Sequence, residues 1–347
     1  MHIHHRQKIA TSRFFLIMLT VMSAHLTAQE RVAMTDVEIQ QALALVDKQP
    51  EKAIALVTSL RVTPYNFGRN LVTAGKTEEA LTWYVALTIA TDDPQYVFGK
   101  AWTHWRKGEV HQALEDGAYL LTLKLADKVL ARTHYMLGMI HLSRQGLKLA
   151  DKHIAASLTA YRKLGMNGGQ YLCHMARAFI ALERNAFDHA EASAELALSF
   201  NNRLRSPYSL GKYYEVYSSI HFSNPPAKPN FAEALHYAAL AQAEFEKSGE
   251  NEHLYVSLAT QGLLHAFLGD FEAAFRIATK VDDFGRPKKY AYLGYYNSLT
   301  WMYLHRCNDL ADDVAQMKVA LQDWSKEKQN GKRLERLLYL VENIPCP

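Results

Sequence analysis

The sequence predicts an all-α protein in which helical hairpins repeat along the chain, an arrangement known as an α-solenoid. From residue 35 onward the apolar residues recur at helical spacing, and no stretch alternates with the period of two that is typical of β-strands. The 347 residues include only 17 Gly and 10 Pro, too few for the many tight turns of a β-sandwich or barrel. A short sequence also recurs where one predicted helix gives way to the next.

This recurring sequence has a Gly or Asn followed five residues later by an Ala. A Gly or Asn takes the left-handed backbone conformation that ends a helix, and the small Ala lets the helix just finished approach closely. The pairs are Gly75 with Ala80, Gly108 with Ala113, Asn185 with Ala190 and Gly269 with Ala274. Together with Ala150 and Ala234, these alanines follow one another at intervals of 33 to 44 residues, which predicts stacked helix pairs.

The repeat resembles the tetratricopeptide (TPR) family, in which a Gly or Ala lies twelve residues before the hairpin Ala and a Gly five before it. The matching triplets are Gly68, Gly75 and Ala80; Ala101, Gly108 and Ala113; and Gly262, Gly269 and Ala274. Leu137-Gly138 matches the Leu-Gly pair of the family, whereas its Trp and its closing Pro are mostly absent. The resemblance covers residues 35–325. It implies a right-handed TPR-like α-solenoid of about eight hairpins, whose first helices line a concave groove that binds proteins or peptides.

The first predicted hairpin has the clearest helix boundaries. Thr35-x-x-Glu38 is a capping box, and Pro50 suits a first helical position. The predicted pairs are 36–47 with 50–60, 65–74 with 76–90, 95–107 with 110–123, 129–143 with 147–164, 169–183 with 187–199, 207–222 with 231–247, 252–268 with 271–280, and 288–304 with 309–324.

The end of the chain predicts a capping helix near 331–342. Leu334, Leu337, Leu338 and Val341 give it one apolar face, while its other face is charged, as the end of a solenoid requires. The loop 223–230 is the one marked interruption. Because helical repeats continue on both sides of it, residues 29–347 are expected to form one continuous domain.

Residues 1–28 have the pattern of a secretory signal peptide. A basic stretch precedes the apolar run from Phe14 to Met22, and Ala28 offers a cleavage site. An uncleaved anchor is the alternative, but nine apolar residues span about 14 Å of a hydrocarbon core of about 30 Å. We therefore expect a periplasmic or secreted protein, with no integral membrane span once the leader is removed. Without these residues the charge falls from +4 to +1 (36 basic against 35 acidic residues), which gives no reason to expect a nucleic-acid partner.

Three cysteines are present. Cys173 and Cys307 lie inside helical patterns and are expected to be small buried apolar residues. Cys346 lies in the terminal Ile344-Pro345-Cys346-Pro347 and is expected to be frayed and accessible. The sequence leaves open whether any of them form disulfides.

The search for catalytic and metal-binding patterns favours neither an enzyme nor a metalloprotein. Gly75-Lys76-Thr77 resembles the end of a phosphate-binding loop, but Asn70 stands where that loop requires its first Gly. His104, His141 and His265 recur with the repeat, which indicates packing between helices; pH-sensitive partner binding and metal binding are the alternatives. We expect no cofactor, no metal and no catalytic residues.

Aromatic residues with basic neighbours supply the candidate binding site. Tyr has a large apolar area and a polar tip, so clusters of Tyr suit either helix packing or a wet binding surface. The candidate peptide-groove residues are Tyr208, Lys212 and Tyr213 in one segment and Arg286, Lys289, Tyr292 and Tyr296 in another. The sequence predicts a noncatalytic exported scaffold that binds a protein or peptide segment. A sugar-binding or enzymatic accessory subunit of an envelope or secretion complex is the alternative.

Overall fold

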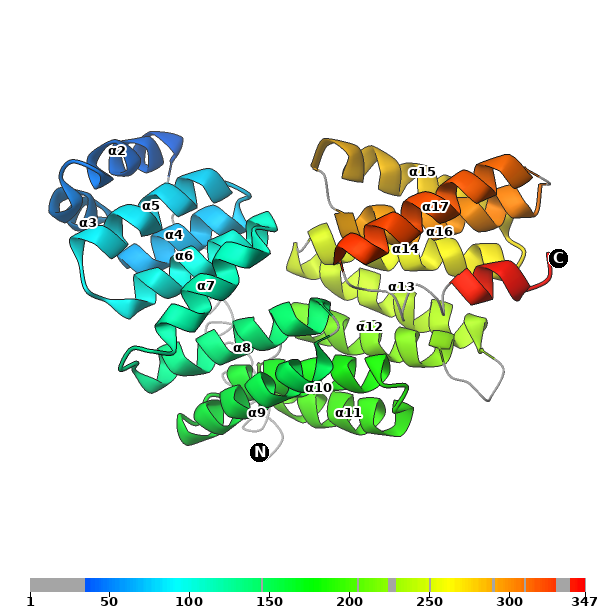
Figure 1. Cartoon of the computed structure of the whole chain (residues 1–347), viewed down its shortest axis with the longest axis horizontal. Helices are drawn as coiled ribbons and strands as arrows, with labels where there is room; N and C mark the ends of the chain where they lie inside the picture. Colours follow the sequence, from blue (N-terminus) through cyan, green and yellow to red (C-terminus); the bar gives the residue numbers. More distant parts are fainter. Residues whose placement is uncertain are drawn as a thin grey trace, which may run out of the picture. The chain divides into compact units, whose positions relative to one another are not determined.

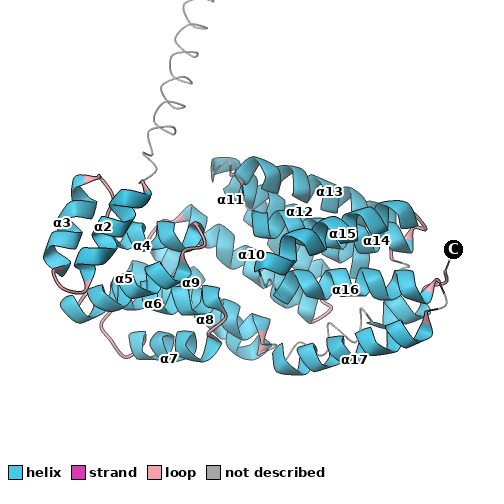
Figure 2. Ribbon diagram, turned by 90° about the horizontal axis from the view of Figure 1, so that it is seen from above, coloured by secondary structure: helices cyan, strands magenta, loops and turns pink. Residues whose placement is uncertain are grey.

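The computed structural model describes residues 35–144, 146–204, 206–223, 229–249, 251–288, 291–308, 310–328 and 338–346. These residues are helical or in short loops, and none of them forms a strand (Figures 1 and 2). The contacts divide the chain into two compact units, residues 1–103 and 104–347, each of which we describe by itself. The predicted leader lies outside the described residues. No described helix combines the length and the apolar character that a membrane span would need.

The helices of the first unit are α2 (Asp36–Val46), α3 (Pro50–Ser59), α4 (Pro64–Thr73), α5 (Thr77–Ala90) and most of α6 (Pro94–Lys107). The predicted capping box is present: the Thr35 side chain accepts a hydrogen bond from the Glu38 backbone, and the Glu38 carboxylate accepts one from the Thr35 backbone. Pro50 is the first residue of α3, as expected.

The core of the first unit explains a glycine of the TPR pattern. Trp83 and Tyr84 are almost fully buried, and the Trp83 Nε1 donates a hydrogen bond to the Pro64 carbonyl at 2.8 Å. A Cβ at Gly68 would lie 2.5 Å from the Tyr84 ring, and a Cβ at Gly99 would lie 2.3 Å from it. Since such contacts are far inside van der Waals distance, only glycine lets both helices pack against this ring.

The second unit consists mainly of antiparallel helical hairpins, in which a first helix packs against the second helix that follows it (Figure 1). Its helices are α7 (Val110–Leu120), α8 (Asp127–Ser143), α9 (Leu147–Lys163), α10 (Asn167–Glu183), α11 (Phe187–Leu204), α12 (Pro207–Ser223), α13 (Phe231–Ser248), α14 (Asn251–Phe267), α15 (Phe271–Lys288), α16 (Ala291–Arg306) and α17 (Ala311–Lys328).

The hairpin turns have the predicted backbone conformation. The φ angles are +78° at Gly75, +84° at Gly108, +57° at Asn185 and +84° at Gly269. The alanines that follow, Ala80, Ala113, Ala190 and Ala274, are all completely buried, and so are Ala150 and Ala234. The recurring sequence therefore marks close helix–helix approaches, and the predicted all-α, TPR-like helical-repeat fold is confirmed.

Some helices are longer than the sequence predicts. Helix α15 continues to Lys288 instead of ending near residue 280, and α11 continues to Leu204 instead of residue 199. Residues 338–343 are helical within the predicted capping helix, and Leu338 and Val341 are buried. Residues 331–337 of that helix lie outside the described residues.

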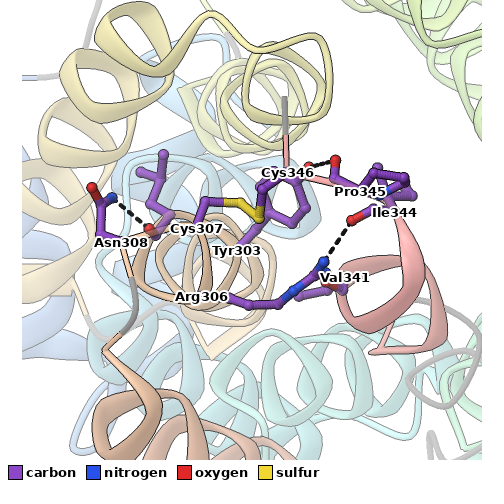
Figure 3. Close-up of a disulfide and its surroundings, with 9 residues drawn as sticks. Tyr303, Arg306, Cys307, Asn308, Val341, Ile344, Pro345 and Cys346 are labelled. Atoms are coloured by element: carbon purple, nitrogen blue, oxygen red, sulfur yellow. Dashed lines mark hydrogen bonds between the residues drawn. A yellow bond between two sulfur atoms is a disulfide. The ribbon is translucent and has the colours of Figure 1, made fainter.

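A disulfide joins Cys307, just after α16, to Cys346, with 5.5 Å between their Cα atoms (Figure 3). The Arg306 guanidinium donates hydrogen bonds to the carbonyls of Val341 and Ile344, and the Tyr303 hydroxyl donates one to the Pro345 carbonyl at 2.9 Å. Cys307 is half-buried rather than buried, and its disulfide answers the question that the sequence leaves open. Cys346 is exposed, as expected, but it is bonded rather than frayed. Cys173 is buried, as expected, and it is a free thiol.

Candidate functional site

The candidate site lies on the first helices of the second unit. Helices α8, α10, α12, α14 and α16 are the first members of successive hairpins, and α10 contacts α12 while α14 contacts α16. Side chains at fixed positions on such helices come together from segments that are far apart in sequence. The residues that meet across α10, α12 and α14 define the surface described next.

Lys212 on α12 lies between an acidic and an aromatic neighbour. Its Nζ donates a hydrogen bond to Glu215 Oε2 at 2.7 Å and lies 4.8 Å from the centre of the Phe179 ring on α10. The Lys212 and Glu215 side chains are only 16% and 22% exposed. Both charges are therefore held at fixed positions on the surface.

Tyr208 and His253 extend this contact group to α14. The Tyr208 hydroxyl lies 3.4 Å from His253 Nε2, and His253 Nδ1 lies 3.9 Å from the Glu215 carboxylate. Phe245 at the end of α13 stacks on the His253 ring with 5.2 Å between the ring centres. We call Phe179, Tyr208, Lys212, Glu215 and His253 the first-helix surface.

Tyr213, the third described candidate, belongs to a different cluster. Its ring contacts Tyr214 and Tyr217 on its own helix, with ring centres 5.5 Å and 4.7 Å apart. Tyr214 and Tyr217 both contact Tyr237 on α13, at 6.1 Å and 5.2 Å. We call these four residues the tyrosine quartet. The structure thus joins Tyr208 and Lys212 through Glu215 and His253, and places Tyr213 in the quartet.

The other candidates are only partly described. The backbone places Arg286 on α15 and both Tyr292 and Tyr296 on the first helix α16. Their side chains and the whole of Lys289 lie outside the described residues. Their role in a groove stays a prediction.

Phe179, Glu215 and His253 were missed in the sequence. Glu215 could have been found, because it follows Lys212 by three residues on one helix and can form an ion pair there. Phe179 and His253 lie 33 and 41 residues from Lys212, on other hairpins. Only the packing of those hairpins brings them to the surface.

The recurring histidines pair with acidic residues at the hairpin turns. His104 Nδ1 lies 2.5 Å from Glu109 Oε2, and His265 Nδ1 lies 3.1 Å from Asp270 Oδ2. In both pairs the acid is five residues after the His, just beyond the left-handed glycine. These contacts connect the two helices of a hairpin, in agreement with a packing role.

His141 has no acid at the equivalent position and contacts other histidines. Its ring stacks on His153 with 5.5 Å between centres, and His153 Nδ1 lies 2.9 Å from His134 Nδ1. Burial and the two neighbouring imidazoles lower the pKa of His153 to about 4, and burial also lowers the pKa values of His134 and His141. The three rings are therefore mainly neutral at pH 7. Within the described part of the chain, no group of three or more His, Cys, Asp or Glu is arranged to hold a metal ion.

Comparison with known proteins gives a fold and no family. No family model matches the chain, and no curated protein does. A solved structure described as "Rap Protein Complexed with Competence and Sporulation Factor" is similar, with a TM-score of 0.59 and 12% identity over 89% of this chain and 95% of that one. Another, "Aspartyl phosphate phosphatase F from Bacillus subtilis", has a TM-score of 0.49 and 13% identity, over 96% of this chain and 90% of the other. The chain is thus a TPR-like helical-repeat protein in fold.

Proposed function

We propose that this chain is an exported, noncatalytic scaffold that binds an extended segment of another protein across its first helices. The observation that carries the proposal is the first-helix surface, where α10, α12 and α14 contribute to one connected group of side chains. A segment that crosses successive first helices would meet all of these groups.

The composition of this surface suits a polypeptide ligand. Aromatic residues are enriched where proteins bind one another, and a few anchored side chains usually supply most of the affinity. Lys212 offers hydrogen-bond donors and Glu215 offers acceptors, the two kinds of group that an extended backbone needs. Phe179, which lies beside Lys212, and Tyr208, which contacts His253, add apolar area.

The neighbouring hydroxyl, imidazole and carboxylate favour binding over catalysis. His253 is 3.4 Å from Tyr208 and 3.9 Å from Glu215, whereas a positioned general base usually lies within about 3.2 Å of its partners. Glu215 is also engaged by Lys212 at 2.7 Å. The arrangement therefore suits recognition of a ligand more than proton transfer.

The similar fold of the solved Rap protein adds support of a general kind. That protein was crystallised in complex with the competence and sporulation factor. A helical-repeat fold of this kind can therefore hold a binding partner, and we extend this property to the present chain.

Two observations support export. The first 28 residues have the pattern of a signal peptide, and Cys307 is bonded to Cys346. Disulfides persist in oxidising compartments and are rare in the cytosol of mesophiles. A periplasmic or secreted location agrees with both.

Site-specific photocrosslinking in cells that produce the protein tests the binding surface. A benzophenone amino acid would replace Lys212 on α12 or, as a control, Leu196, which is 46% exposed on α11. The proposal expects a defined protein adduct from position 212 that is absent from position 196. Adducts from position 196 alone, or equal adducts from both positions, would contradict it.

A further inference from the structure

The tyrosine quartet forms a closed set of aromatic contacts. Starting from Tyr213, the ring centres follow one another at 5.5 Å to Tyr214, 6.1 Å to Tyr237, 5.2 Å to Tyr217 and 4.7 Å back to Tyr213. Tyr217 is buried, whereas the other three are half-buried. Aromatic rings from two helices are therefore gathered in one cluster, and three of them are partly exposed to solvent.

Carboxylates lie next to these rings. The Tyr217 hydroxyl is 3.4 Å from the carboxylates of Glu191 and Glu195, two exposed residues on α11. Glu233, near the start of α13, is close enough to Tyr237 for its charge to add to burial in raising the Tyr237 pKa. Among the described residues, no ion pair joins these three carboxylates to a Lys or Arg.

Two imidazoles also contact the quartet. His221 stacks on Tyr237 with 5.3 Å between ring centres, and His236 meets the same ring edge-on at 5.5 Å. The quartet is thus a partly exposed group of aromatic rings next to three carboxylates.

A cation is the complementary ligand for such a surface. The face of an aromatic ring has partial negative charge, and a cation within about 6 Å of the ring centre is attracted to it. Exposed carboxylates strengthen the attraction and raise the local concentration of cations. Neighbouring rings whose centres lie 4.7 to 6.1 Å apart offer a broad aromatic surface, which suits the bulky, weakly hydrated head of an alkylammonium group.

We propose that the tyrosine quartet, with Glu191 and Glu195, binds an alkylammonium cation. This group occurs on lysine side chains and on small quaternary amines. The site lies on α11, α12 and α13 and uses none of the residues of the first-helix surface, so it does not depend on the proposed function.

Calorimetric titration of the full chain with choline tests the chemistry, and 3,3-dimethylbutan-1-ol serves as an uncharged control of the same shape. We expect choline to bind at least tenfold more tightly than the neutral alcohol. Titration with Nα-acetyl-lysine methylamide then distinguishes the sources: tighter binding than choline indicates a lysine side chain, and weaker binding indicates a quaternary amine. Equal affinity for choline and the alcohol, or binding of neither cation, would overturn the proposal.

Variants locate the site. Glu195→Gln should weaken the binding of choline about fivefold, whereas Asp188→Asn, an exposed carboxylate on the same helix, should leave it unchanged. Tyr237→Phe keeps the ring and should retain the affinity, and Tyr237→Leu should lose it. If Tyr237→Leu unfolds, the variants of the two exposed carboxylates still test the proposal. Equal affinity of Glu195→Gln and Asp188→Asn for choline would contradict the placement of the site at the tyrosine quartet.

Discussion

At the hairpin turns a single backbone angle determines which residue fits. Gly108 has a φ of +84°, and a Cβ at this position would meet nothing within 4 Å. A side chain at this position would therefore meet no neighbouring atom. Its cost would come from the backbone conformation, because L-residues are disfavoured in the left-handed region by about 1–2 kcal/mol. Asn185, with a φ of +57°, occupies the same position in another hairpin, as Asn is the side chain that best tolerates this conformation.

The variant Gly108→Ala should lower the free energy of unfolding by about 1 kcal/mol for this reason. Gly168→Ala is the matched control in the same unit, since Gly168 also has open space around it but lies in the first turn of α10. There alanine should be neutral or stabilising. Urea denaturation of both variants measures the difference, and equal effects would refute the assignment of strain to the turn.

The histidine group of His134, His141 and His153 makes stability depend on pH. In the unfolded chain these imidazoles have pKa values near 6.5, and in the folded protein the values are lower, about 4 for His153. As the pH falls from about 6.5 towards 4, the unfolded chain takes up protons that the folded protein does not. The folded state is therefore most favoured above pH 7 and loses stability on acidification.

His153→Gln should reduce this dependence. We expect the loss of unfolding free energy between pH 7 and pH 5 to shrink by about 1 kcal/mol, which allows for solvent screening of the half-exposed rings. Denaturation at pH 7, 6 and 5 provides the values, with the exposed His189→Gln as the control. An unchanged slope in His153→Gln would show that these rings do not couple folding to protonation.

Among the elements, the C-terminal segment shows how a covalent bond and polar contacts act together. Residues 338–346 are fastened to the end of α16 by the disulfide, by Arg306 and by Tyr303 (Figure 3). Leu338 and Val341 of this segment belong to the core cluster that includes Leu299 and Met302 on α16. The segment therefore covers apolar surface of the last hairpin, as a solenoid cap does.

Reduction of the disulfide should destabilise the second unit. A bond between residues 39 apart restricts the unfolded chain by roughly 4 kcal/mol in the loop-entropy account. The midpoint of urea denaturation should fall when a thiol reductant is added to the wild type, and Cys346→Ser should show the low midpoint in either condition. Cys173→Ala serves as a control that should keep the response to reductant. Identical wild-type midpoints with and without reductant would contradict this role.

Local signals predicted the elements well but could not predict contacts between them. Thr35, Glu38 and Pro50 indicate helix starts through interactions within one turn, and the structure has each of them. Asp282, by contrast, lies inside α15, where no local pattern indicates its partners. Asp282 accepts hydrogen bonds from Asn297 at 2.6 Å and Trp301 at 3.1 Å on α16. Such a contact depends on packing, which no sequence period reveals.

The candidate site shows the same difference between local signals, which the sequence reveals, and contacts between helices, which it does not. The Tyr-rich composition of α12 predicted a binding surface that includes Tyr208 and Lys212, and the structure connects these two residues through Glu215 and His253. It could not separate Tyr213, because the direction of a side chain 100° further round the helix matters only once α11 and α13 are in place. Phe179 and His253 come from other hairpins, and their approach follows from the stacking of the repeats.

At the scale of the whole molecule, the proposed export predicts the first residue of the mature chain. Cleavage after Ala28 should leave a protein that begins at Gln29, because small residues follow an apolar run too short to anchor. N-terminal sequencing and intact-mass measurement of the protein from the envelope or medium identify the first residue. A chain that still begins at Met1 and remains with the membrane fraction would refute processing.

The most direct test of the central claim uses the partner protein that crosslinking at position 212 identifies. The partner is purified, and its affinity is measured for the wild-type chain and for two matched charge-reversal variants. Lys212→Glu should weaken binding at least about tenfold, because it places two like charges at the centre of the first-helix surface. Lys148→Glu reverses an exposed charge on the second helix α9 and should stay within about twofold of the wild type. If Lys212→Glu binds as tightly as the wild type, or if Lys148→Glu weakens binding equally, this surface is not where the chain holds its partner.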